Sequence, residues 1–465
     1  MLFLKSQTWF MRSPFDNIVL RNMKIIIVGA GEVGSHLAKM LSRESHDIIL
    51  IDEDSEKLQK IESNYDLMTI EGSPTSIKDM RGAGVQSADL FIAVTPIESQ
   101  NITACILARN LGAKKTLARI DNYEYLLPEN KTFFEKLGVN ALIYPEMLAS
   151  EEIVNSLKVN WVRQWMEFND GALTLIGMKV RKNAPIVNKR LMDLKNSENY
   201  RIVAIRRDLE TIIPTGSDEV QANDIVYFIT TRDFVVHVRE QAGKNVIDVR
   251  DLMIMGGGKI AVRTVLSLPD GMSAKVLEKN KNKAVKIAEQ MDDAFIVLGD
   301  ASNLELLKEE GIEDMDAFVA LTDNSEANIL ACIAAKRFGL QKTIAEIENI
   351  DYIPLAESLD IGTVINKKII AASYIYQYTL DVDVNKVKSL THVDAEVVEL
   401  TAKEGSKITS ALVKDLNLPK NLFIGGVIRD GKGFIVNGMS QILPNDNVVV
   451  FCLSSSIRKL DKLFN

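Results

Sequence analysis

Short apolar runs alternate with helical stretches along the first third of the chain. The runs that we interpret as strands, which are rich in Val, Ile and Leu, are residues 24–28, 47–51, 67–70, 89–94, 116–120 and 140–143. Helical stretches such as residues 99–111 lie between them. Near-continuous apolar strands that alternate with helices are typical of a parallel sheet covered on both faces. The pattern therefore predicts an α/β domain over residues 23–150.

This pattern occurs twice, because many positions return at a constant distance along the chain. Gly29 recurs as Gly256, and the same offset takes Thr95 to Thr322. The offset also relates Asn101 to Asn328, Ala104-Cys105 to Ala331-Cys332, Gly112 to Gly339, and Lys115-Thr116 to Lys342-Thr343. An offset this constant predicts a tandem duplication, with a second α/β domain over residues 250–375.

Each α/β domain is followed by a smaller region of different character. Residues 160–242 and 384–465 are richer in short strands, which are separated by turns containing Pro, Gly and Asp. These two regions also match each other, since Gly216 recurs as Gly438 and Asp224 as Asp446 at one shared offset. The sequence thus predicts two Rossmann-like parallel-sheet domains, each followed by a small α+β domain.

Residues 1–22 fit neither kind of domain. Lys5 and Arg12 interrupt apolar runs that are too short for the hydrophobic region of a signal peptide. A second methionine, Met23, directly precedes the first predicted strand. We interpret residues 1–22 as a disordered or mis-assigned leader, in preference to an arm that touches a membrane.

A glycine-rich turn joins the first predicted strand to the first predicted helix. The segment is Gly29-Ala30-Gly31-Glu32-Val33-Gly34, a GxGxxG pattern. Its glycines allow a tight turn, close approach of a pyrophosphate and close packing of the helix, whose N-terminus attracts phosphate. Asp52 follows Gly34 at nearly the spacing expected of a carboxylate that binds ribose hydroxyls. Because Glu53 and Asp54 would repel a 2′-phosphate, the motif predicts NAD(H) or another adenine nucleotide.

The second repeat carries a variant of this turn with different charges. Its segment is Gly256-Gly257-Gly258-Lys259-Ile260-Ala261, and its acidic residue is Glu278. Lys259 in this turn corresponds to Glu32 in the first turn. Conversely, Arg119 at the end of the fifth predicted strand corresponds to Glu346 in the second repeat. Each pocket keeps one cation near the expected phosphates but at a different place, so we hypothesise that the two pockets prefer different nucleotides.

No catalytic group is shared by the two repeats. A dehydrogenase needs an acid or base facing the nicotinamide, and none of the four histidines occupies a repeated position. Cys105 and Cys332 stand at equivalent points of apolar helices, where small core residues are expected. No metal-ligand spacing is present in the sequence. The sequence predicts a nucleotide-binding protein that is not an enzyme.

Composition narrows the class further. The 465 residues are 46% hydrophobic and 25% charged, as in folded globular proteins, and a net charge of −8 argues against a nucleic-acid partner. Three cysteines cannot form a disulfide framework, which favours a reducing, intracellular compartment. No run approaches the roughly 18–20 apolar residues of a membrane-spanning helix.

Three segments carry a resemblance to a known family: residues 24–41, 88–120 and 316–347. They resemble the regulator-of-K⁺-conductance domains, called RCK or KTN domains. The duplicated large-small arrangement over residues 23–465 is similar to the TrkA family, the peripheral cytosolic subunits of Trk potassium uptake systems.

The resemblance implies a location, a partner and a ligand. Four chains would form a homotetrameric ring on the cytoplasmic face of the cell membrane, beneath a Trk-type membrane subunit that translocates potassium. NAD(H), with ADP and ATP as competing effectors, would change the shape of the ring and so the gate. The implied contacts of the first repeat are Gly29, Ala30, Gly31, Glu32, Val33, Gly34, Asp52, Ser73, Thr95, Pro96 and Arg119. Those of the second repeat are Gly256, Gly257, Gly258, Lys259, Ile260, Ala261, Glu278, Asp300 and Thr322.

Two other functions stay open at this point. An NAD-dependent oxidoreductase is disfavoured because the repeats share no acid or base. A regulator of another cation channel or antiporter could use the same domains.

Overall fold

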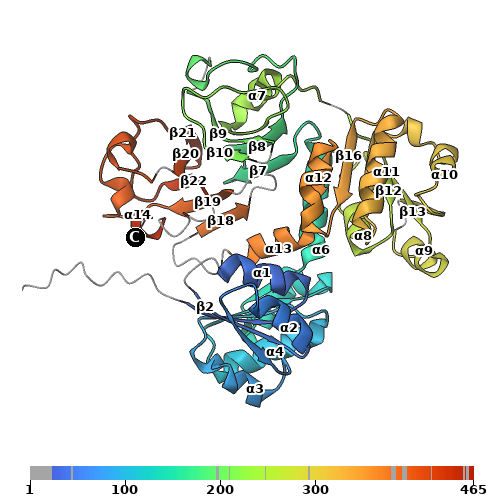
Figure 1. The fold of residues 1–465 in the computed structure, drawn as a ribbon, viewed down its shortest axis with the longest axis vertical. Helices are drawn as coiled ribbons and strands as arrows, with labels where there is room; N and C mark the ends of the chain where they lie inside the picture. The colour runs from blue at the N-terminus through green and yellow to red at the C-terminus, as the bar shows by residue number, and fades with distance from the viewer. Residues whose placement is uncertain are drawn as a thin grey trace, which may run out of the picture.

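The computed structural model describes most of the chain. The described residues are 23–42, 46–194, 198–208, 210–246, 248–291, 294–376, 378, 384–389, 395–419, 421–453, 456 and 460–464. The interpretation of residues 1–22 as a leader concerns a segment outside the described residues. Figure 1 shows two α/β lobes, which we call N-lobe 1 (residues 23–144) and N-lobe 2 (248–366), and two antiparallel lobes, C-lobe 1 (159–246) and C-lobe 2 (384–464).

N-lobe 1 contains a six-stranded parallel sheet in the order β3-β2-β1-β4-β5-β6. Its strands are β1 (Lys24–Val28), β2 (Asp47–Asp52), β3 (Met68–Glu71), β4 (Leu90–Ala93), β5 (Lys115–Arg119) and β6 (Ala141–Ile143). Its helices are α1 (Glu32–Ser42), α2 (Ser55–Glu62), α3 (Ile77–Gly82), α4 (Glu98–Leu111) and α5 (Pro128–Lys136). The strand order reverses at β1, so the carboxyl ends of β1 and β4 border the crevice where such sheets bind ligands.

N-lobe 2 repeats this sheet in the order β14-β13-β12-β15-β16-β17. Its strands are β12 (Asp251–Met255), β13 (Ser273–Glu278), β14 (Ala294–Leu298), β15 (Ala317–Ala320), β16 (Lys342–Glu346) and β17 (Thr363–Ile365). Its helices are α8 (Lys259–Leu266), α9 (Lys281–Ala288), α10 (Leu304–Glu309), α11 (Ser325–Arg337) and α12 (Ile353–Ser358). The predicted Rossmann-like duplication is confirmed.

The two C-lobes contain five-stranded antiparallel sheets. C-lobe 1 has β7 (Gln164–Phe168), β8 (Leu173–Lys179), β9 (Tyr200–Arg207), β10 (Glu210–Ile212), β11 (Ile225–Thr231) and helix α7 (Val235–Gln241). C-lobe 2 has β18 (Val384–Ser389), β19 (Ala395–Thr401), β20 (Leu422–Arg429), β21 (Lys432–Ile435), β22 (Asn447–Leu453) and helix α14 (Asp461–Phe464). The sheet orders are β10-β9-β11-β8-β7 and β18-β19-β22-β20-β21.

The repeated Asp224 and Asp446 make the same contact in the two C-lobes. Arg207 donates two hydrogen bonds to Asp224, at 3.0 and 2.9 Å, and Arg429 donates two to Asp446, at 2.8 and 2.7 Å. Such bidentate charge-assisted pairs fix both the distance and the plane of the partners. The carboxylates are buried and also accept backbone N–H groups of their own turns, so each pair fastens a turn to a neighbouring strand.

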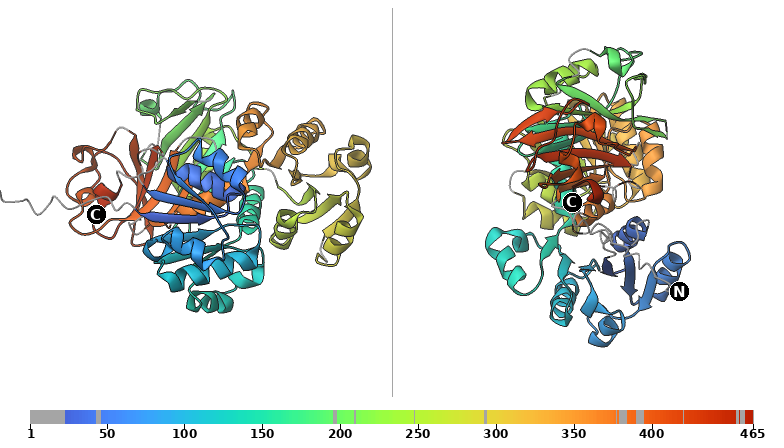
Figure 2. Two further views of the ribbon diagram at one scale, coloured as in Figure 1. Left: turned by 60° about the horizontal axis from the view of Figure 1, so that its bottom comes forward. Right: turned by 90° about the vertical axis from the view of Figure 1, so that its left-hand side faces the viewer.

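The two C-lobe sheets pack against each other within one chain. Phe168 and Tyr227 of C-lobe 1 share a buried apolar cluster with Val397 and Phe451 of C-lobe 2. Figure 2 shows the two sheets lying next to each other in both views. Segments from the two repeats, which are far apart in sequence, therefore form one core that ties the two halves of the duplication together.

Two helices are exchanged between the N-lobes. Helix α6 (Pro145–Lys158) follows the sheet of N-lobe 1 but buries Ile153 and Leu157 in the core of N-lobe 2, against α8. Helix α13 (Lys367–Tyr376) follows N-lobe 2 but buries Ile375 in the core of N-lobe 1, against α1. Each helix that begins at a glycine turn thus rests on a helix of the other repeat.

Cys105 and Cys332 are fully buried, as expected for core residues, and burial raises the pKa of Cys332 to about 12. Among the described residues, no helix is both long enough and apolar enough to cross a bilayer.

Candidate nucleotide-binding sites

The first glycine turn is tight on one side and open on the other. Gly29 adopts a φ of 104°, and its N–H donates to the carbonyl oxygen of Ile51 at 2.8 Å. A Cβ at Gly34 would lie 1.8 Å from the carbonyl oxygen of Gly29, so helix and turn meet where only glycine fits. A Cβ at Gly31 would meet nothing within 4 Å. The open side is where a phosphate can approach the N-terminus of α1.

Asp52 fastens this turn from the end of β2. Its carboxylate accepts the N–H of Ala30 inside the turn and, at 2.9 Å, the N–H of Asp54. An ionised carboxylate has about four acceptor positions, so two remain for ligand hydroxyls. Asp52, the predicted ribose-binding residue, therefore also stabilises the turn, a role that its spacing from Gly34 does not predict.

The second turn has the same hydrogen bonds with a longer acid. The N–H of Gly256, whose φ is 97°, donates to the carbonyl oxygen of Leu277 at 2.8 Å. Glu278 accepts the N–H of Gly257 at 2.9 Å and that of Asn280 at 2.8 Å. Burial opposes ionisation of Glu278, but these backbone donors and Lys283, 3.4 Å away, together hold its pKa below the ordinary value. Glu278 is thus a charged acceptor at neutral pH.

Each N-lobe also contains a buried asparagine that the site prediction missed. Asn101 accepts the N–H of Thr95 at 2.9 Å and its hydroxyl at 2.8 Å, and donates to the carbonyl oxygens of Thr95 and Arg119, both at 2.9 Å. Asn328 makes the same four contacts with Thr322 and Glu346. Each asparagine fixes the loops after two neighbouring strands, and its repetition at the offset of the duplication was the available signal.

The residue that ends the fifth strand forms an ion pair in each lobe, but the signs of the two charges are reversed between the lobes. In N-lobe 1, Arg119 Nη2 lies 3.2 Å from Oε1 of Glu146 at the start of α6. In N-lobe 2, Glu346 Oε1 lies 3.4 Å from Nζ of Lys367 at the start of α13. Burial raises the pKa of Glu346 to about 7, despite the opposing influence of Lys367. In both lobes the residue that ends the fifth strand thus pairs with a residue at the start of the following helix, α6 or α13, with the two charges reversed.

The two glycine turns differ in charge at Glu32 and Lys259, and each of these residues forms an ion pair with the other repeat. Lys259 pairs with Asp121, which follows β5 of N-lobe 1. Glu32 lies 2.9 Å from Nζ of Lys368 on α13. The cation predicted near the phosphates of the second site is therefore also engaged by a carboxylate of the first lobe.

Four of the predicted residues of the second repeat line one cavity of about 340 Å³: Gly256, Glu278, Asp300 and Thr322. Lys279 and Lys283 line it too and were not predicted. Asp300 accepts the N–H and hydroxyl of Ser302, and these two hydrogen bonds hold its pKa below the ordinary value. The other predicted residues of this repeat lie in the turn or in the first turn of α8.

The predicted residues of the first repeat lie at the carboxyl edge of their sheet. The turn Gly29–Gly34, Asp52, Ser73 and Thr95 follow or end four adjacent strands, β1 to β4. The N–H of Ser73 donates to Asp79 at 3.0 Å, Thr95 is buried, and Pro96 is exposed before α4. Val33 is buried in the first turn of α1.

Two Rossmann-like lobes with equivalent glycine turns, each joined to an antiparallel lobe, define a duplicated protein with two pairs of lobes. The family model for the TrkA-N domain matches residues 25–145 and 252–367, and the model for the TrkA-C domain matches residues 175–255 and 397–465. The chain belongs to the TrkA family.

Two relatives agree with this assignment, and a solved structure has a similar fold. The chain is 31% identical to the Trk system potassium uptake protein TrkA of Halomonas elongata, over 95% of this chain and 98% of the relative. It is 32% identical to the protein of the same name from Haemophilus influenzae, with the same coverage of both chains. The fold resembles the crystal structure of the GsuK RCK domain, with a TM-score of 0.60, 13% identity, and coverage of 97% of this chain and 96% of the other.

Proposed function

We propose that this protein is the nucleotide-binding regulatory subunit of a Trk potassium uptake system. Its relatives in Halomonas elongata and Haemophilus influenzae are named Trk system potassium uptake proteins, and the chain matches them over nearly their full length. The partner is a membrane-embedded subunit that translocates potassium, and the chain acts on the cytoplasmic face of the membrane. Four copies form the ring that contacts this partner.

The proposed ligand is NAD(H), with ADP and ATP as competing effectors. A GsuK channel bound to NAD has the same fold, with a TM-score of 0.58, 13% identity, and coverage of 97% of this chain and 80% of that one. The open side of the glycine turn in N-lobe 1 and the cavity beside the turn in N-lobe 2 would hold the pyrophosphate, and Asp52 or Glu278 would accept the ribose hydroxyls. The single observation that carries the proposal is that both acids bond to an N–H of their own turn, at the same edge of the two sheets.

Ligand binding is coupled to shape through the exchanged helices. A ligand shifts an equilibrium between two conformations only by its difference in affinity for them. The helices α1 and α8 begin at the turns and pack on α13 and α6 of the other repeat. A displacement of either helix is therefore transmitted to the other lobe. The protein acts as a sensor, and its site residues hold and orient the nucleotide without reacting with it.

The test is potassium uptake in a bacterial strain that lacks its own uptake systems, grown at low potassium. A Trk-type membrane subunit is expressed alone, with this chain, or with the Asp52→Asn, Glu278→Gln variant of this chain. We expect uptake that depends on the chain and is reduced in the double variant. Equal uptake with and without the chain would contradict the proposal.

A further inference from the structure

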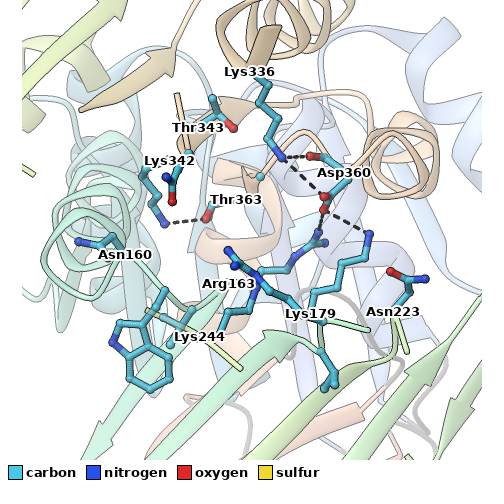
Figure 3. A pocket seen from close by; sticks show the side chains of 16 residues that line it. Asn160, Arg163, Lys179, Asn223, Lys244, Lys336, Lys342, Thr343, Asp360 and Thr363 are labelled. Atoms are coloured by element: carbon cyan, nitrogen blue, oxygen red, sulfur yellow. Dashed lines mark hydrogen bonds and ion pairs between the residues drawn. The ribbon is translucent and has the colours of Figure 1, made fainter. Parts of the chain in front are cut away.

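A second kind of cavity lies between C-lobe 1 and N-lobe 2. We call it the joint cavity; its volume is about 220 Å³. Lys342 and Thr363, which line it, are the first residues of β16 and β17, so the cavity lies at the amino edge of the sheet, opposite the glycine turn. Figure 3 shows its side chains converging from both lobes. It is therefore distinct from the proposed nucleotide sites.

The lining of the joint cavity is strongly cationic. C-lobe 1 contributes Arg163, Lys179, Arg181 and Lys244, and N-lobe 2 contributes Lys336 and Lys342. The same lining contains one carboxylate, Asp360. Like charges gathered in a partly enclosed space repel one another, and an anion in that space relieves the repulsion.

Asp360 is already shared by three of these cations. Arg163, Lys179 and Lys336 approach its carboxylate at 2.5, 3.3 and 3.7 Å. Within the part of the chain that the structure describes, Lys244 and Lys342 form no ion pair with a carboxylate. The cavity thus holds more positive charge than its own side chains neutralise.

Lys342 is the most deeply buried of these cations. It is only 4% exposed, and its ammonium group donates to the hydroxyls of Ser156 at 2.7 Å and Thr363 at 3.1 Å, two neutral partners. Burial lowers the pKa of Lys342 to about 7, and burial with the neighbouring Arg181 and Arg163 lowers that of Lys244 to about 8. A bound anion would favour the charged form of both lysines.

This arrangement is not a by-product of the duplication. Lys115, the counterpart of Lys342 in the first repeat, is exposed at the start of β5. Arg109, the counterpart of Lys336, donates to the backbone carbonyls of Ala113 and Lys114, whereas Lys336 contacts both the carbonyl oxygen and the carboxylate of Asp360. At these two positions the first repeat therefore lacks the arrangement that the second repeat has in the joint cavity.

We propose that the joint cavity binds a compact multivalent phosphate anion that bridges C-lobe 1 and N-lobe 2. Its volume suits a diphosphate group, whereas a whole dinucleotide needs more room. A neighbouring cavity of about 650 Å³ shares Arg163, Lys179 and Asn223, so the phosphates can be free or carried by a nucleoside. Occupancy draws the cations of the two lobes together and so stabilises one angle between them.

The test is calorimetric titration of the intact chain with two probes, inorganic pyrophosphate and ADP. We expect the Lys244→Gln, Lys342→Met variant to lose at least one binding event seen with the unmodified chain, or to weaken it by about tenfold or more. The Lys182→Gln variant changes the same charge at an exposed neighbour outside the cavity and should bind as the unmodified chain does. Lys244→Arg, which keeps the charge, should preserve binding.

The two probes separate the sources of the phosphate. If the double variant loses a binding event only in the titration with pyrophosphate, the natural ligand is a free anion. If it loses one only in the titration with ADP, the ligand is a nucleotide. Equal binding of both probes by the double variant and the unmodified chain, or no binding of either probe, would overturn the proposal. If the double variant does not fold, the comparison of Lys244→Gln with Lys244→Arg decides the question alone.

The affinity for NADH, measured on the same variants, should stay unchanged. A failure of the unmodified chain to bind NADH would contradict the proposed function instead.

Discussion

The two N-lobes share their hydrogen bonds but differ in their charges. In both, a carboxylate fastens the glycine turn and an asparagine fixes the loops after the fourth and fifth strands. At the end of the fifth strand, however, Arg119 pairs with Glu146 in one lobe and Glu346 pairs with Lys367 in the other. The two halves of the duplication therefore share the hydrogen bonds that shape the turn and differ in the charges beside it.

A second difference lies in the turns themselves. Gly34 meets the backbone oxygen of Gly29 so closely that a Cβ does not fit, whereas Ala261 occupies the equivalent place in N-lobe 2 and is fully buried. The second turn therefore accommodates a buried methyl group at the place where the first turn has none. Variants that remove or exchange these features test which of them determines the affinity for the nucleotide.

The largest effect on NADH affinity and on stability is expected from Gly34→Val. Its Cβ would overlap the carbonyl oxygen of Gly29, so the first turn must open, at a cost of about 3 kcal/mol in unfolding free energy. NADH affinity at N-lobe 1 should fall by about a hundredfold. Calorimetry and thermal unfolding measure the two effects. Ala261→Gly is the matched control and should leave binding at N-lobe 1 intact; an unchanged affinity in Gly34→Val would show that the turn does not hold the ligand.

The next largest effect is expected from the turn carboxylates. Asp52→Asn and Glu278→Gln each replace a charge-assisted hydrogen bond to a turn N–H by a weaker one, so affinity for NADH should fall about tenfold at the altered lobe. Titration of the two single variants and the double variant measures it. If both single variants bind two equivalents of NADH as tightly as the unmodified chain, neither acid is a ligand.

A smaller effect is expected from exchanging the charge pair of the fifth strand. Arg119→Glu places a second carboxylate beside Glu146, which is 7% exposed, and should lower the unfolding free energy by about 1–2 kcal/mol. Adding Glu146→Lys restores a pair of the N-lobe 2 type and should recover most of this loss. A double-mutant cycle measures the coupling. Strictly additive effects would mean that the pair does not act as a unit. The affinities of the double variant for ADP and ATP test whether this charge pair determines the nucleotide preference of N-lobe 1.

The smallest effect concerns pH. Burial raises the pKa of Glu346 to about 7, so the folded protein keeps this proton to a higher pH than the unfolded chain does. Its contribution to stability is complete below the ordinary glutamate pKa of about 4.3 and is lost as the pH rises through about 7. The advantage of Glu346→Gln over the unmodified chain should therefore grow between pH 5 and pH 8, on the order of 1 kcal/mol. Thermal unfolding at both values measures it, and a constant difference would contradict the raised pKa.

The local parts of the structure were predictable from the sequence. The parallel sheets follow from apolar runs such as residues 24–28, and the tight turns follow from the glycine pattern; Gly29 and Gly256 adopt a positive φ in these turns. These features depend on residues close together in the chain. The repeat offset then extended the prediction from one lobe to the other.

The contacts between the repeats were not predictable in this way. Nothing in the segment that forms α6 distinguishes packing on its own lobe from packing on N-lobe 2. The pairing of Lys259 with Asp121 and the gathering of Arg163 and Lys342 in the joint cavity depend on that exchange. Such contacts join residues far apart in the chain, and their partners are fixed by tertiary packing and not by local pattern.

The central claim is that the chain binds nucleotide in two turns of shared framework and does not consume it. Equilibrium titration of the intact chain with NADH, followed by recovery of the nucleotide, tests this most directly. We predict saturable binding that weakens in Asp52→Asn, with all NADH recovered in its reduced form. Absence of binding at millimolar NADH, or steady oxidation of NADH in the presence of a metabolite, would contradict the account.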